Sequence, residues 1–331
     1  MLSRRRFLAA SGGLLAAGAT VDQAAFAQTQ IEGWPSKPIK VVFPTGAGGP
    51  SELFRMYAEY MKDKFGQPFL FENRPGGSGS IGVMEVVRSP ADGHTLVVGS
   101  NSFTVLNPLV FANSPVNTKR DLAPIALIFS YRFLLVVNPK HGVKTWKEFL
   151  DYAKARPGQL NYGSPGIGTG GHLVTELMLK RAGIQAVHVP YQATTQQMLA
   201  TAGGHLDFTF DTVGNAKSVV DSGKITALAV SGKGRAAAMP DIPSFGELGV
   251  DGFDGLFVSL SALAPAGTPK PIIAALNREI VACQDKPDIK DRLEKGSYEP
   301  SRLSPEEILA FFDEDHKNWS QVVKETGVRV N

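Results

Sequence analysis

The sequence predicts an α/β protein built from two domains around mostly parallel β-sheets. Short apolar runs alternate with amphipathic helical patterns along most of the chain, and this alternation is typical of βαβ units. The chain has 331 residues, of which 43% are hydrophobic and 20% charged. Because a single core seldom grows beyond about 250–300 residues, this length favours two domains.

The N-terminus has the pattern of a secretory signal peptide. A basic start at Ser3–Arg6 is followed by an apolar Ala/Gly-rich run and by the sequence A-F-A at 25–27. The paired arginines before Phe7 resemble a twin-arginine export signal, and an ordinary secretory signal with an extra arginine is the alternative. We therefore expect residues 1–27 to be cleaved and the mature chain to work in the periplasm.

The charge balance gives no sign of a nucleic-acid partner. The whole chain has a formal net charge of +3; without residues 1–27, Lys plus Arg falls from 34 to 31 and Asp plus Glu from 31 to 30, which leaves +1. The sequence contains no basic stripe of the kind that nucleic acids require. The single cysteine, Cys283, permits no internal disulfide and is interpreted as a helix-core residue. We expect a monomer without metal or cofactor.

The first elements follow from short apolar runs and helical periodicity. The run at 39–43 predicts a strand, and apolar spacing of i, i+3, i+4, i+7 and i+8 predicts a helix over 52–65. Ser51 is expected to cap this helix and Gly66 to end it. Further apolar runs predict strands at 69–72 and 95–99, with a short helix between them that ends at Val87.

The middle section begins with an unusually long apolar run at 125–137, which predicts one long strand or two strands joined at 130–132. Thr145 and Glu148 have the spacing of a capping box and predict a helix to about Ala155. Strands are then expected at 160–163, 186–190, 208–211 and 225–230, and helices at 172–181 and 195–201. The last third is expected to be helical, over 271–283, 287–294 and 304–324, with Ser304 as a cap.

The apolar runs at 125–137 and 225–230 bracket the middle section, and we interpret both as crossings between domains. One domain is then discontinuous, comprising 28–130 plus 231–331, and the other comprises 131–230. Ligands of open α/β sheets bind at the carboxyl ends of the strands. The loops that follow the strands are therefore expected to face a cleft between the two domains.

Two glycine-rich loops are the main candidates for a binding site. Thr45–Gly49 follows the first strand, Ser164–Gly171 follows the strand at 160–163, and each leads into a helix. Glycine lets backbone N–H groups approach a ligand, and a helix N-terminus carries about +0.5 charge, so each loop is an expected anion site. Neither loop contains Lys or Arg. Valine in place of Gly48 or Gly168 is expected to abolish binding and to leave the fold intact.

Polar side chains after other strands extend this candidate site, each with a structural alternative. Ser100 and Asn101 line the cleft or form a turn, and Tyr191 lines the cleft or belongs to the core. Asp211 binds a ligand hydroxyl or amine or caps the next helix, and His172 contacts the ligand or is a cap or packing residue. The residues expected to bind ligand are Thr45, Gly46, Ala47, Gly48, Gly49, Ser51, Glu52, Ser100, Asn101, Ser164, Gly166, Gly168, Thr169, Gly170, Gly171, His172, Tyr191 and Asp211.

Other chemistries lack their sequence signatures. Segments 77–82 and 166–171 match G-x-G-x-x-G, but neither is followed by the acidic residue that dinucleotide binding needs at the end of the next strand. The sequence has no G-x-S-x-G motif, and its six histidines have no metal-ligand spacing. We therefore expect a binding protein and not an enzyme. An exported enzyme with the same cleft is the rival hypothesis, and its signature would be a nucleophile–base pair.

An ordered set of short motifs gives a resemblance to a known family. The motifs are WPSKPIKVVFP at 34–44, GG at 48–49, NRPGG at 73–77, IG at 81–82, ADGHTL at 91–96, LNYGS at 160–164, GHL at 171–173, VPY at 189–191, PDIP at 240–243 and APAGTP at 264–269. Each motif alone is weak, but their order covers essentially the whole mature chain. In this respect the sequence resembles the Bug-type receptors, the extracytoplasmic solute-binding proteins of tripartite tricarboxylate transporters.

The resemblance implies a type II periplasmic-binding fold, in which two α/β lobes and a hinge enclose a ligand cleft. It also implies that the protein captures a small organic carboxylate and delivers it to integral membrane subunits of a transporter; a sensor without an uptake role is the alternative. In this family the loops that correspond to Thr45–Gly49 and Ser164–Gly171 hold a ligand carboxylate, largely through backbone N–H groups and ordered water. Glu52 replaces the family's usual Asp, and its extra methylene alters the reach toward a ligand amino group.

Overall fold

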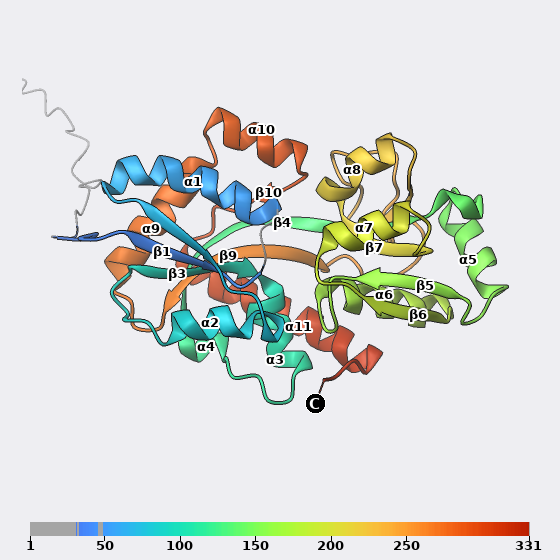
Figure 1. Ribbon diagram of the computed structural model, residues 1–331, viewed down its shortest axis with the longest axis horizontal. Helices are drawn as coiled ribbons and strands as arrows, with labels where there is room; N and C mark the ends of the chain where they lie inside the picture. Colours follow the sequence, from blue (N-terminus) through green and yellow to red (C-terminus); the bar gives the residue numbers. More distant parts are fainter. Residues whose placement is uncertain (1–30, 32, 46–48, 331) are drawn as a thin grey trace, which may run out of the picture.

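The computed structural model describes residues 31, 33–45 and 49–330 and has the predicted α/β class (Figure 1). The predicted signal peptide and loop residues Gly46, Ala47 and Gly48 lie outside the described residues. Two α/β halves lie side by side along the long axis of the molecule (Figure 1). Each half has its own sheet, and the strand β4 (Leu122–Val137) belongs to both.

The first half contains the N-terminal strands and most of the C-terminal helices. Its strand order is β2-β1-β3-β9-β4, with β1, β2 and β3 parallel and β9 antiparallel to both of its neighbours. The strands are β1 (Ile39–Phe43), β2 (Phe69–Asn73), β3 (Thr95–Ser100), β9 (Phe257–Pro265) and β10 (Glu299–Pro300). The helices are α1 (Gly49–Phe65), η1 (Gly77–Gly79), α2 (Ser80–Val87), η2 (Ser102–Leu106), α3 (Asn107–Val110), α4 (Thr118–Asp121), α9 (Lys270–Cys283) and α10 (Pro287–Lys295).

The second half is built on the other part of β4. There β4 pairs with β8 and with β7, and the sheet continues through the parallel strands β5 and β6. The strands are β5 (Leu160–Ser164), β6 (Ala186–Pro190), β7 (Phe208–Thr212) and β8 (Thr226–Val230). The helices are η3 (Pro139–His141), α5 (Trp146–Lys154), α6 (Gly170–Ala182), α7 (Thr194–Ala202) and α8 (Val213–Asp221).

The long apolar run of the sequence forms one strand. Residues 122–132 of β4 pair with β9, and residues 133–137 pair with β7 and β8. Its side chains are buried along most of its length, because helices cover the sheets on both faces. This double burial explains why the run is apolar almost throughout.

The strand predicted at 225–230 does not cross between the halves. β8 pairs with the second part of β4, and the following segment packs on the same core through Phe245, Phe253 and Leu256. The chain returns to the first half with β9, which begins at Phe257. We therefore propose a second lobe of 133–256 in place of 131–230, and a first lobe of 31–132 plus 257–330.

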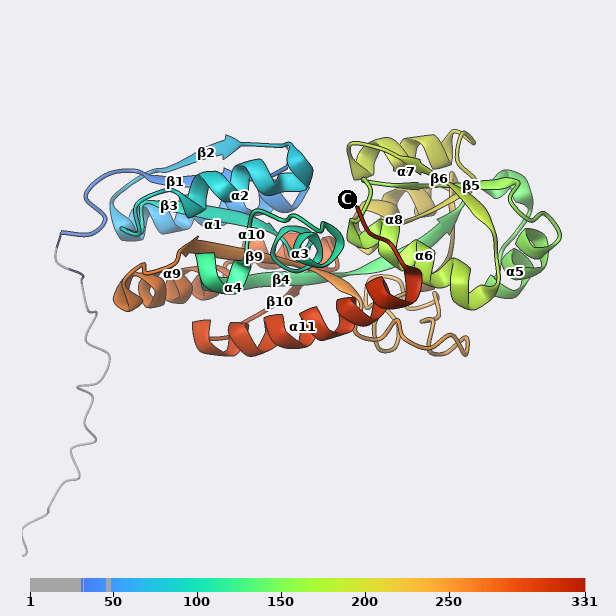
Figure 2. The same ribbon diagram turned by 90° about the horizontal axis from the view of Figure 1, so that it is seen from below.

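Helix α11 (Pro305–Thr326) runs along both halves (Figure 2). Near its start, Ile308 and Phe312 pack in a core cluster with residues of β1 and α2. Toward its end, Trp319 and Val323 pack in the large core of the second half. This helix therefore connects the two halves in addition to β4. Within the part of the chain that is described, no helix combines the length and the apolar character that a membrane span requires.

Most predicted elements are confirmed within a few residues, and several details differ. The capping boxes at Thr145 and Ser304 both form. Helix α1 begins at Gly49, so Ser51 lies inside its first turn and is not the N-cap as predicted. The periodicity did not predict β9, where Ser259 and Ser261 interrupt the apolar pattern. It also gave no bounds for α8 and did not predict the short helices η2, α3 and α4.

Candidate functional site

The strands that precede the two glycine-rich loops end near the middle of the molecule. β1 and β5 run toward the middle from opposite sides, so their carboxyl ends lie near the region where β4 passes between the halves (Figure 1). In the first loop, exposed Thr45 accepts a hydrogen bond at its carbonyl oxygen from Asn73 Nδ2 (2.9 Å). Gly49 then opens α1, whereas Gly46, Ala47 and Gly48 lie outside the described residues.

The second loop is fully described and leads directly into α6. Gly166 and Gly168 have φ values of +131° and +79°, which favour glycine. Thr169 is the N-cap residue, and its carbonyl oxygen accepts the first intrahelical bond, from Leu173 N (3.0 Å). The backbone N–H groups of Gly170, Gly171 and His172 therefore have no acceptor within the helix. They coincide with the positive end of the helix dipole, so this helix start can bind an anion.

Ser164 stabilises the first part of this loop. Its side chain is fully buried, and its Oγ accepts a hydrogen bond from Gly166 N (3.2 Å) and lies 2.7 Å from His188 Nε2. Thr169 Oγ1 donates to the Gly166 carbonyl oxygen (2.8 Å). In this structure both hydroxyls therefore form hydrogen bonds within the loop. Their predicted contact with a ligand stays a prediction.

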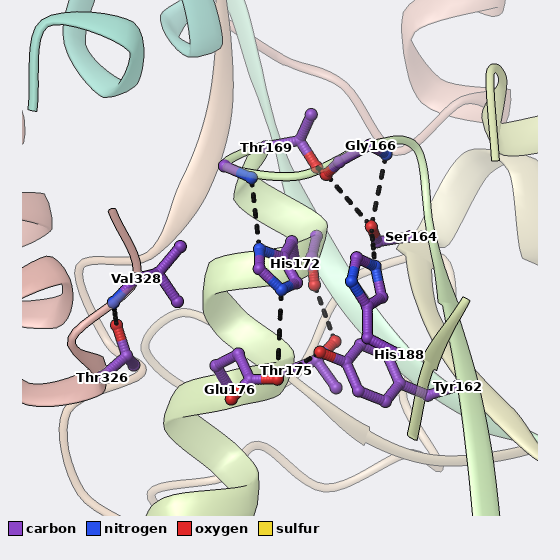
Figure 3. A network of polar contacts seen from close by, with 12 residues as sticks. Tyr162, Ser164, Gly166, Thr169, His172, Thr175, Glu176, His188, Thr326 and Val328 are labelled. Carbon is purple, nitrogen blue, oxygen red and sulfur yellow. Dashed lines mark hydrogen bonds and ion pairs between the residues drawn. The ribbon is translucent and has the colours of Figure 1, made fainter. Parts of the chain in front are cut away.

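His172 holds the last part of the loop. Its buried ring accepts a hydrogen bond at Nδ1 from Gly168 N (3.2 Å), and its centroid lies 4.2 Å from that of His188 (Figure 3). Burial lowers the pKa of His172 to about 4, so the ring is neutral at pH 7. These contacts match the packing alternative for this residue.

A cluster of three aromatic rings lies next to the loop (Figure 3). Tyr162 stacks on His188 with centroids 4.9 Å apart, and His188 stacks in turn on His172 (Figure 3). The Tyr162 hydroxyl donates to Glu176 Oε1. The spacing of the histidines in the sequence did not predict this contact between the rings of His172 and His188. The missed signal is the register of β5 and β6, which places Tyr162 directly opposite His188.

Asp211 is the second notable group near the ends of these strands. It lies in β7, next to β5, and is almost completely buried. Its Oδ1 accepts hydrogen bonds from Thr212 N (2.6 Å) and Asn215 Nδ2 (3.1 Å), whereas Oδ2 has no partner among the described residues. Burial raises the pKa of Asp211 to about 6. The side chain of Thr212, not of Asp211, caps α8, so the capping alternative is wrong.

The other predicted residues occupy more ordinary positions. Asn101 is buried and donates from Nδ2 to the Phe257 carbonyl oxygen (3.1 Å) and to Asp315 Oδ2 (3.0 Å), so its amide links three elements. Glu52 is exposed on α1 and pairs with Arg55 at 3.4 Å. The remaining predicted residues are Ser51, which is buried in the first turn of α1, Ser100, which is half-buried at the end of β3, and Tyr191, which is half-buried and donates its N–H to the Ser164 carbonyl oxygen (2.8 Å).

Comparison with known families gives a match along most of the chain. Residues 53–328 match the model of the tripartite tricarboxylate transporter family receptor. A UPF0065 protein from the gbd 5′ region of Cupriavidus necator is 32% identical over 337 residues, which cover 99% of each chain. Protein BugT of Bordetella pertussis is 29% identical over 307 residues, covering 92% of this chain and 94% of BugT.

Solved structures give the same result for the fold. A Rhodopseudomonas palustris protein solved with adipate superposes with a TM-score of 0.83 at 29% identity, covering 89% of this chain and 98% of that one. MatC from the same organism, with bound malate, superposes with a TM-score of 0.81 at 27% identity and coverages of 88% and 100%. The periplasmic binding protein BugD also superposes, with a TM-score of 0.81 at 27% identity and coverages of 89% and 99%, so the fold is that of periplasmic binding proteins. The chain belongs to the tripartite tricarboxylate transporter receptor family, whose members include the Bug proteins and are solute-binding receptors.

Proposed function

We propose that the protein is a periplasmic receptor that binds a small organic carboxylate between its two lobes and delivers it to integral membrane subunits of a tripartite transporter. The observation that carries this proposal is the glycine loop at the start of α6. It combines three backbone N–H groups without intrahelical acceptors and a helix dipole, and residues 164–172 contain neither Lys nor Arg. Two structural neighbours with 29% and 27% identity hold the carboxylates adipate and malate.

In the proposed site, backbone N–H groups bind one carboxylate of the ligand. The N–H groups of Gly170, Gly171 and His172 supply these donors from the second lobe, and Thr45–Gly49 supplies them from the first. The free Oδ2 of Asp211 is a buried acceptor at the adjacent strand end, and it suits a ligand hydroxyl or amine. A ligand gripped from both sides must be released by separation of the lobes, so binding is accompanied by closure.

The rival hypothesis of a periplasmic enzyme has one observation in its favour. Ser164 Oγ lies 2.7 Å from His188 Nε2, which is the distance of a nucleophile–base pair. However, Ser164 Oγ also accepts the Gly166 N–H (3.2 Å) and donates to the Gly166 carbonyl oxygen (3.1 Å), so the hydroxyl is engaged by the loop in this structure. We therefore propose that this pair has a loop-bracing role and that the protein is a receptor without catalytic activity.

A thermal-shift screen tests the proposal. The chain beginning at Gln28 is heated with malate, adipate, citrate, glutamate or benzoate, and with a sugar and a divalent cation for comparison. A ligand at 100 times its Kd adds about 2.7 kcal/mol to the free energy of unfolding, which raises Tm measurably. We expect at least one carboxylate to raise Tm. A response to the sugar or the cation and to no carboxylate would contradict the proposal.

A further inference from the structure

We propose that His172 is the positioning residue of the anion-binding loop and that it acts through imidazole Nδ1. This inference rests on the proposed function, because it concerns how the same loop is kept ready for a carboxylate. His172 itself does not contact the ligand through its ring. Its role is to hold Gly168 in the conformation that precedes the start of α6.

The backbone N–H of Gly168 is already bonded within the protein. Gly168 has a φ of +79° and donates its N–H to His172 Nδ1 at 3.2 Å, in a buried contact. That N–H is therefore used inside the protein and is not a donor for the ligand. The backbone donors left at this end of the loop are those of Gly170, Gly171 and His172. The imidazole thus removes the Gly168 N–H from the donors that a ligand could use.

The hydrogen bond that the His172 ring accepts fixes its protonation state. A ring nitrogen that accepts an N–H must carry a lone pair, so the proton of neutral His172 lies on Nε2. Nε2 faces Glu176 Oε1 at 3.9 Å, on the side away from the loop (Figure 3). Burial lowers the pKa of His172, which supports the neutral form at pH 7. The state required for the Gly168 bond is therefore the one present under ordinary conditions.

Neighbouring rings pack against the His172 ring and restrict its orientation. His172 packs on His188, and His188 packs on Tyr162. His188 also contacts Ser164 Oγ, which accepts the Gly166 N–H. The ring that bonds Gly168 and the ring that contacts Ser164 are therefore packed against each other, so the contacts at both ends of the loop belong to one cluster.

Three substitutions separate an acceptor role from simple packing. Asparagine places its carbonyl oxygen near the position of Nδ1, glutamine reaches the position of Nε2, and phenylalanine keeps the ring without any acceptor. Calorimetry measures the affinity of His172→Asn, His172→Gln and His172→Phe for whichever of malate, adipate, citrate, glutamate or benzoate binds the wild type most tightly. Exposed His205, changed to Asn, is the control for the loss of a histidine.

We expect His172→Asn to bind within about threefold of the wild type, and His172→Gln and His172→Phe to bind about tenfold more weakly or worse. Equal loss in the Asn and Gln variants, or wild-type affinity in the Phe variant, would overturn the proposal. If the Phe variant fails to fold, the comparison of Asn with Gln decides alone.

A ligand-free readout separates this inference from the proposed function. Amide hydrogen exchange of Gly168 should remain slow in His172→Asn and become faster in His172→Gln. If the wild type binds none of the carboxylates, the proposed function fails, whereas the exchange of Gly168 still reports on the histidine bond. Fast exchange of Gly168 in the wild type would overturn the inference even if a carboxylate binds.

Discussion

Gly168 is required both for the backbone conformation of the loop and for its packing against Val110. Its φ of +79° disfavours a side chain, and a Cβ built on it would lie 2.8 Å from Val110 Cγ1. The sequence reasoning expected valine here to abolish binding without harm to the fold. The contact with α3 revises that expectation, because a side chain at this position also disturbs packing within the large core.

Gly168→Ala measures this effect at the scale of a single methyl group. Gly142 has a similar φ of +68° but open space around its Cβ, so Gly142→Ala isolates the backbone cost. We expect about 1–2 kcal/mol of destabilisation at Gly142 from the left-handed conformation, and a larger loss at Gly168 because Val110 must also shift. Urea unfolding of both variants checks this. Equal losses would mean that the contact with Val110 is unimportant.

Among the elements, α11 carries a buried acid at the place where it passes the strand ends of the first half. Asp315 Oδ2 accepts a hydrogen bond from Asn101 Nδ2, whereas Oδ1 has no partner among the described residues. Burial raises the pKa of Asp315 to about 6, above its ordinary value of 3.8. The protonated carboxyl is thus favoured by folding, and ionisation of Asp315 destabilises the folded state.

The sign of the pH dependence follows from this shift. The stability associated with Asp315 is fully present below about pH 4 and is lost as the pH rises through 6. Asp315→Asn removes this loss and keeps an oxygen for Asn101. The stability of Asp315→Asn relative to the wild type should therefore increase between pH 5 and pH 8, by about 1–1.5 kcal/mol. Urea unfolding at both pH values checks it, and a constant difference would contradict the assignment.

The elements show why the sequence predicts some features and not others. The apolar run of β4 and the capping boxes at Thr145 and Ser304 are local patterns, and all of them formed as expected. The pairing of β9 between β3 and β4 depends on contacts between residues far apart in the sequence, which periodicity does not contain. The interpretation of 225–230 as a crossing failed for the same reason.

In the candidate site, too, local sequence patterns predicted some features, and others depend on contacts between distant residues. Glycine spacing before a helix located the loop at 164–171 without any structure. The contacts that hold it, from His172 and His188 on α6 and β6, become visible only when the strands are paired. Asp211 was predicted from its place near the end of a strand, but only the structure shows that Thr212 caps α8 and that Asp211 Oδ2 has no partner among the described residues.

At the scale of the whole molecule, β4 and α11 connect two halves that the proposal requires to close on a ligand. Small-angle X-ray scattering of the chain beginning at Gln28 should show a smaller radius of gyration when a binding carboxylate is added to saturation. An unchanged radius at saturation would favour a cleft that is closed before the ligand arrives.

The central claim is that the protein recognises the negative charge of a carboxylate through backbone donors. Calorimetric titration with the carboxylate that binds most tightly and with its neutral amide, for example malate and malamide or adipate and adipamide, tests this claim most directly. The account predicts saturable binding of one carboxylate per chain and a loss of affinity of about tenfold or more for the amide, since hydrogen bonds to charged groups contribute about 1.5–3 kcal/mol. Equal affinity for the carboxylate and its amide would contradict it.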